Sequence, residues 1–129
     1  MAPGRYSEEL LRAFAGGEHE AFLAAGGRPL RPRLARSLDL ARIAPGLPVV
    51  DLGCGRGEAS AHAALRGARV TAVDYSPDAL RMTGRSAEVV LDDAEAAAGR
   101  VRRVAASADA LPLPDARGSM PQMYCALSR

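Results

Sequence analysis

The chain has 129 residues and a formal net charge of +2, from 17 basic residues that are all arginine and 15 acidic ones. This length suits one hydrophobic core, and the mixing of arginines with acids favours a solvated surface over a nucleic-acid-binding face. No segment is apolar enough for a membrane span, and Cys54 and Cys125 form no C-x-x-C pair, so we expect a cytoplasmic, reducing location without disulfide framework or metal site.

The first third of the chain reads as helices separated by glycines. A helix start at Ser7 is stopped by Gly16–Gly17, and a second short helix is expected over Glu18–Ala25. Leucines recur at about four-residue spacing over Leu30–Leu38, which predicts an amphipathic helix. We assign residues 1–45 to an N-terminal helical segment.

Strands and helices then alternate. Buried parallel strands are predicted over Pro48–Leu52 and Arg69–Val73, and a weaker edge strand over Val101–Ala106. The helices expected between them cover Glu58–Arg66, Ser76 to about Met82, and Ser86–Ala98. Because strands that alternate with helices imply right-handed crossovers, we predict an α/β domain with a doubly wound parallel sheet of about three strands.

Glycines occupy the alternate positions Gly53, Gly55 and Gly57, directly after the first predicted strand. Ligands of such folds bind beyond the carboxyl ends of the strands, where glycine brings main-chain N–H groups close and a helix N-terminus favours an anion. Asp74 closes the second strand, where a carboxylate can accept hydrogen bonds from two ribose hydroxyls. We expect Asp74 to point to solvent and to contribute little to stability.

The pattern is not that of a dinucleotide-binding loop, because Glu58 stands where the third glycine of G-x-G-x-x-G belongs. The stretch that begins at Asp51 reads D-x-G-x-G-x-G, and it closely resembles motif I of class I S-adenosylmethionine-dependent methyltransferases. VTAVDYSPDAL resembles their second motif, and VRRVAASADALPLPD resembles the segment after their third strand. The resemblance implies a Rossmann-like fold, S-adenosylmethionine as cofactor, and methyl transfer to an acceptor for which we favour a small molecule.

The resemblance also implies roles for individual residues. The methionine part of the cofactor would lie along the three glycines, with Asp51 bracing the loop or reaching the amino group through water. Asp74 would accept from the ribose hydroxyls, and Tyr75 would pack near the adenine. The family's acid-alanine pair falls on Ser107–Ala108, so a serine hydroxyl replaces the acid that would accept from the adenine amino group, with Asp109 two positions along.

No catalytic residue is indicated. His19 and His62 are expected on the surface or on a helix face, and Cys54 is expected to be a small space-filler rather than a nucleophile. Methyl transfer from a sulfonium needs mainly positioning, so a missing base does not exclude an enzyme.

We expect the second half of the family's fold to be missing from the sequence. We assign residues 46–115 to an S-adenosylmethionine-binding half-domain and 116–129 to an irregular tail, as in a truncated product or a module that a partner chain completes. The strand order would be 3-2-1, with the first strand at an unpaired edge. Two alternatives are a non-catalytic cofactor-binding or interaction fragment and, disfavoured by Glu58, a nicotinamide-dependent oxidoreductase domain.

Overall fold

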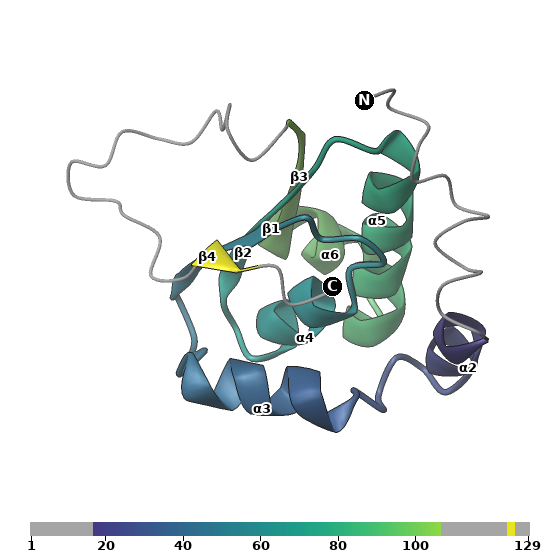
Figure 1. The fold of residues 1–129 in the computed structure, drawn as a ribbon, viewed down its shortest axis with the longest axis horizontal. Coiled ribbons are helices and arrows are strands. Elements are labelled where there is room, and N and C mark those ends of the chain that lie inside the picture. The colour runs from purple at the N-terminus through teal and green to yellow at the C-terminus, as the bar shows by residue number, and fades with distance from the viewer. Residues whose placement is uncertain (1–16, 107–123, 126–129) are drawn as a thin grey trace.

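The computed structural model of the chain describes residues 17–106 and 124–125 (Figure 1), so the helix expected from Ser7 lies outside the described residues. The first half comprises α2 (Glu18–Ala24), α3 (Pro32–Leu40), β1 (Pro48–Leu52), α4 (Glu58–Leu65) and β2 (Arg69–Asp74). The second half comprises α5 (Pro77–Leu91), α6 (Ala94–Arg100), β3 (Val101–Ala105) and β4 (Tyr124–Cys125). This alternation is the Rossmann-like α/β arrangement that the sequence predicts.

The strands form one sheet in the order β3-β2-β1-β4, and each pair is parallel. The expected order 3-2-1 is therefore confirmed. The expectation of a wholly unpaired edge is wrong, because Val50 and Asp51 of β1 pair with Tyr124 and Cys125 of β4. Strand pairing uses main-chain groups, so a two-residue strand needs no apolar run and leaves no clear pattern in the sequence.

One face of the sheet packs on helices. Val49, Val70 and Val101 occupy matching register positions on β1, β2 and β3, and all three are buried. Ala61 and Ala64 of α4 belong to the same core cluster, and their short side chains allow a close approach of helix and strand. Figure 1 shows α4, α5 and α6 grouped beside the sheet, with α3 alongside α4.

The helix after β2 is longer than predicted. Ser76 caps α5 by accepting from the N–H of Ala79 at 3.3 Å, and the helix continues to Leu91 without the break expected before Ser86. Gly84 lies inside it, where a Cβ would stand 2.5 Å from the Arg103 guanidinium. The glycine thus lies against the exposed Arg103 side chain and does not end the helix, although glycine within a helix costs about 1 kcal/mol.

No helix among the described residues is long and apolar enough to cross a membrane.

Candidate functional site

The backbone angles of the loop between β1 and α4 explain why it contains three glycines. Gly53, Gly55 and Gly57 have φ angles of 67°, 56° and 79°, in the left-handed region that other residues enter only with strain. The chain therefore changes direction three times between the end of β1 and the start of α4. The flexibility of glycine is needed at each of these positions for the turn itself.

Most of the loop's main-chain donors are bonded within the protein. The N–H groups of Gly53 and Cys54 donate to the Val73 carbonyl at 2.8 and 3.1 Å, and the Gly55 N–H donates to Asp74 Oδ2 at 3.2 Å. The N–H groups of Arg56 and Glu58 have no partner within residues 17–106 and 124–125. The donors left for a ligand are therefore near the start of α4 and not at the first two glycines.

Asp74 does not point to solvent, contrary to our expectation. It is 6% exposed, and its two carboxylate oxygens accept from the N–H groups of Gly55 and Ser76, the latter at 3.0 Å. The sequence shows that an acid ends β2, but not that the loop after β1 folds over it. Each oxygen keeps a second lone pair, so the carboxylate can accept further hydrogen bonds.

Asp51 is the second buried acid at this end of the sheet. Its side chain is 1% exposed; Oδ2 accepts from the Ser60 hydroxyl at 2.6 Å, while Oδ1 has no partner among the described residues. Burial, and to a smaller extent the charge of Asp74, raises the pKa of Asp51 from 3.8 to about 7, against the opposing effect of the Ser60 hydrogen bond. A buried carboxylate with a free oxygen suits a cationic or hydrogen-bond-donating ligand.

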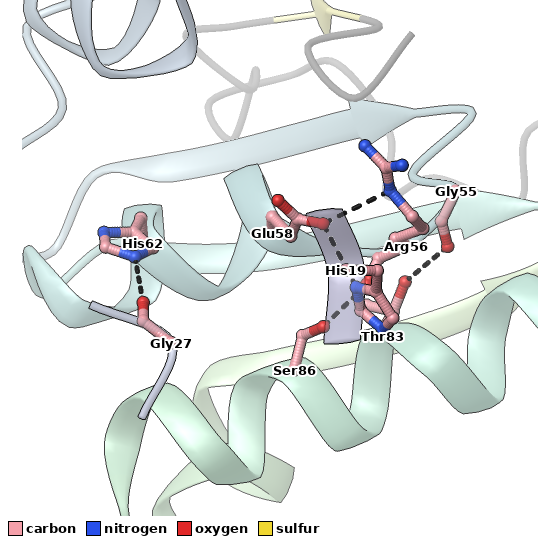
Figure 2. Close-up of polar contacts among 8 residues, drawn as sticks. All are labelled: His19, Gly27, Gly55, Arg56, Glu58, His62, Thr83 and Ser86. Atoms are coloured by element: carbon pink, nitrogen blue, oxygen red, sulfur yellow. Dashed lines mark hydrogen bonds and ion pairs between the residues drawn. The ribbon is translucent and has the colours of Figure 1, made fainter. Parts of the chain in front are cut away.

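Two hydroxyls of α5 hold the loop from below, as Figure 2 shows. Ser86 donates to the Arg56 carbonyl at 2.7 Å, and the Thr83 hydroxyl lies 3.2 Å from the Gly55 carbonyl and 3.1 Å from Cys54 Sγ. A Cβ on Gly57 would stand 2.4 Å from Thr83 Cα, so this glycine is also required for the close approach of loop and helix. The buried Cys54 has a raised pKa, chiefly from burial, and fills space as predicted.

Comparison with known proteins decides the family. The sequence profile of the methyltransferase domain matches residues 49–126, a stretch that begins in β1 and includes the glycine loop and Asp74. The chain belongs to the class I S-adenosylmethionine-dependent methyltransferases. This assignment favours our first interpretation over the nicotinamide-dependent alternative.

A curated member of the methyltransferases is similar over part of its length. The chain is 45% identical over 74 residues to a probable cobalt-precorrin-6B C(15)-methyltransferase (decarboxylating) from Pyrobaculum calidifontis. The matched part is 54% of this chain and 38% of the relative, so the chain spans well under half of that enzyme.

The structure brings most of the methyltransferase residues named from the sequence to one place. Asp51, the glycine loop and Asp74 gather at the carboxyl ends of β1 and β2, and Tyr75 follows directly, with a half-buried side chain. Ser107 and Ala108 lie outside the described residues. In the part of the chain that is described, no cluster of His, Cys, Asp and Glu has the makings of a metal site.

Sequence analysis missed one cluster beside the methyltransferase loop. His19 lies on a face of α2, one of the two expected placements, but it is fully buried and not on the surface. Its Nδ1 lies 3.1 Å from Glu58 Oε2, and Arg56 Nε lies 3.2 Å from the same oxygen (Figure 2). His62 is a helix-face residue as expected, with Nε2 2.6 Å from the Gly27 carbonyl and a pKa lowered chiefly by burial. The only sequence signal for the cluster was an acid at the third-glycine position.

Proposed function

We propose that this chain binds S-adenosylmethionine at the carboxyl ends of β1 and β2 and presents its methyl group to an acceptor. One observation carries the proposal: in a member of the methyltransferase family, the glycine loop turns three times and is fastened to Asp74 at 3.2 Å. A loop held in this way presents a fixed surface to the ligand. Pre-formed loops bind with less loss of conformational entropy than loops that must order.

The buried acids fit the chemistry of this cofactor. Oδ1 of Asp51, which has no partner among the described residues, would receive the amino group of the methionine part, which supplies both a donor and a compensating positive charge. Asp74 keeps acceptor capacity on both oxygens for the two ribose hydroxyls. We further propose that Tyr75 packs near the adenine and that Ser107 and Ala108 lie at its amino group.

The chain's chemical contribution in this proposal is positioning. When bound, the cofactor would supply a methyl group on a positively charged sulfur, to which an acceptor atom would bond as the carbon–sulfur bond breaks and S-adenosylhomocysteine leaves. Ser86 and Thr83 fix the loop that orients the methionine part, and correct orientation by itself accelerates such a step strongly. Burial raises the pKa of the Cys54 thiol and so disfavours its thiolate, and we assign no catalytic residue.

We propose a small molecule as the acceptor. The Pyrobaculum relative is named for methylation of cobalt-precorrin-6B at C(15), which makes cobalt-precorrin-6B one acceptor to assay. The matched region is 38% of that enzyme, so methylation of the same acceptor by this chain is a proposal for assay.

Calorimetric titration tests the proposal directly. The chain should bind S-adenosylmethionine and its demethylated product S-adenosylhomocysteine, and both more tightly than NAD. Tighter binding of NAD would overturn the cofactor assignment. Cofactor binding without transfer of a labelled methyl group to any candidate acceptor would instead support the non-catalytic, cofactor-binding alternative.

A further inference from the structure

Arg56 is held at two points. Its carbonyl accepts from Ser86 of α5 at 2.7 Å, and its side-chain Nε lies 3.2 Å from Glu58 Oε2. The Arg56 and Glu58 side chains are only 11% and 5% exposed. A long side chain fixed at both its backbone and its Nε has lost most of its rotamer freedom before any ligand arrives.

His19 completes the support from a distant part of the chain. Its ring is fully buried and stacks near Phe22, with ring centroids 6.2 Å apart, and Nδ1 lies 3.1 Å from the oxygen that Arg56 also contacts. Glu58 is therefore held between α2 and the glycine loop. This arrangement fixes the carboxylate that in turn fixes the guanidinium.

The end of the guanidinium remains available. Figure 2 shows the two Nη atoms of Arg56 on the side away from Glu58, and the described residues provide no hydrogen-bond partner for either of them. The main-chain N–H groups of Arg56 and Glu58 are also unpartnered within the described ranges, and they belong to the same start of α4. These donors all belong to Arg56 and Glu58, next to the positive end of α4.

A hydrogen-bond acceptor lies at the same helix turn. Asp51 Oδ2 is bonded to Ser60 in the first turn of α4, and the other oxygen, Oδ1, is buried without a described partner. Cationic donors and an anionic acceptor therefore flank one helix start. The amino-acid end of S-adenosylmethionine carries the complementary pair, a carboxylate and an ammonium group.

We infer that Arg56 receives the carboxylate of the cofactor's amino-acid end through its Nη atoms, with Glu58 and His19 as positioning residues. This inference rests on the proposed function. A guanidinium can bind a carboxylate through two parallel hydrogen bonds, which fixes direction as well as distance. Because Glu58 already contacts the same guanidinium, we expect the contact between Arg56 and the ligand carboxylate to raise affinity by about tenfold, which is less than an isolated pair of these groups would give.

The decisive experiment compares two ligands on two proteins. Decarboxylated S-adenosylmethionine lacks only the carboxylate, so the unmutated chain should bind it about tenfold more weakly than S-adenosylmethionine. Arg56→Gln should lose about tenfold for S-adenosylmethionine and little for the decarboxylated ligand. Equal losses for both ligands would show that Arg56 only shapes the loop, and would overturn the inference.

Further variants test the positioning residues. The quantity measured is the affinity for S-adenosylmethionine divided by that for the decarboxylated ligand, a ratio that a merely destabilised fold leaves unchanged. Glu58→Gln and His19→Gln should both reduce the ratio, and Arg56→Lys should retain part of it. His62→Gln is the matched control. His62 lies on α4 like Glu58, and its replacement breaks the 2.6 Å contact with the Gly27 carbonyl but none with Arg56. An unaltered ratio in Glu58→Gln would overturn the positioning role, whereas failure of the unmutated chain to bind either ligand would overturn the proposed function itself.

Discussion

Asp74 Oδ2 accepts a hydrogen bond from the Gly55 N–H at 3.2 Å, which joins the end of β2 to the loop that follows β1. Its other oxygen accepts from Ser76, the N-cap of α5, at 3.0 Å. One buried carboxylate therefore connects the glycine loop, a strand end and a helix start. The Asp74 carboxylate, which we propose accepts hydrogen bonds from the ribose hydroxyls, therefore also maintains the shape of the ligand-free site.

Asp74→Ala should therefore lower both the stability of the ligand-free chain and its affinity for S-adenosylmethionine. The change leaves two N–H groups without their acceptor, at a cost of about 1–3 kcal/mol for each buried one. Urea unfolding followed by circular dichroism measures the first effect, and calorimetry the second. An Asp74→Ala chain that binds poorly but unfolds at the unmutated midpoint would contradict the bridging role.

Gly57→Ala should destabilise the chain more than Gly46→Ala does. The two glycines have almost the same φ, 79° and 80°, so the backbone strain of a side chain is matched at about 1–2 kcal/mol. Only at Gly57 would the new Cβ collide, 2.4 Å from Thr83 Cα, whereas Gly46 has open space within 4 Å. Thermal unfolding of both variants should show an additional loss of about 1–3 kcal/mol at Gly57. Equal losses would mean that α5 shifts freely away from the loop.

Ser86→Ala should destabilise the loop, because it removes the donor to the Arg56 carbonyl at 2.7 Å from a fully buried serine. The expected cost is about 1–3 kcal/mol if the carbonyl stays unpaired. Ser37→Ala is a suitable control, since Ser37 donates to the Arg33 carbonyl at 2.9 Å on the exposed side of a helix, where water can replace it. Urea unfolding of the two variants measures this cost. Similar midpoints for Ser86→Ala and Ser37→Ala would count against the support of the loop by α5.

Local signals in the sequence predicted much of this site. Val49 and Val50 with their flanking turn residues marked β1, and its predicted bounds match those observed. The alternating glycines marked a loop with unusual backbone angles, and Ser76 followed by proline marked the start of α5. Each of these features depends on residues adjacent in the chain, which is why sequence patterns capture them.

Contacts between distant residues were not predictable in the same way. His19 and Glu58 lie 39 positions apart, and nothing in either local pattern shows that α2 packs on the start of α4. A helix break was expected between Met82 and Ser86, and the contact of Gly84 with Arg103 could not be foreseen because Arg103 comes from another element. The pairing of β4 with β1 likewise depends on main-chain groups that every non-proline residue carries.

Asp51→Asn should stabilise the ligand-free chain at alkaline pH. Burial raises the pKa of Asp51 to about 7 in the folded chain from its ordinary 3.8, so the folded state holds a proton that the unfolded state has released. The free energy of unfolding therefore falls as pH rises from about 4 to about 7, by about 4 kcal/mol at most. Asn carries no charge, so its unfolding free energy should lack this slope and exceed that of the unmutated chain at about pH 8. Urea unfolding at several pH values checks this, with exposed Asp39→Asn as control; a slope that persists in Asp51→Asn would place its origin elsewhere.

The same carboxyl group should make cofactor binding depend on pH in the opposite sense. An ammonium group beside Asp51 stabilises the ionised carboxylate, so binding lowers the pKa of Asp51 and releases a proton when pH is near 7. Affinity for S-adenosylhomocysteine, which carries the same amino group, should rise with pH up to about 7 and level off above it. Calorimetry in buffers of different ionisation enthalpy measures the released proton directly. Asp51→Asn should release none and bind more weakly at about pH 8 despite its more stable fold. If both chains released the same number of protons on binding, Asp51 would not lie beside the ammonium group of the ligand.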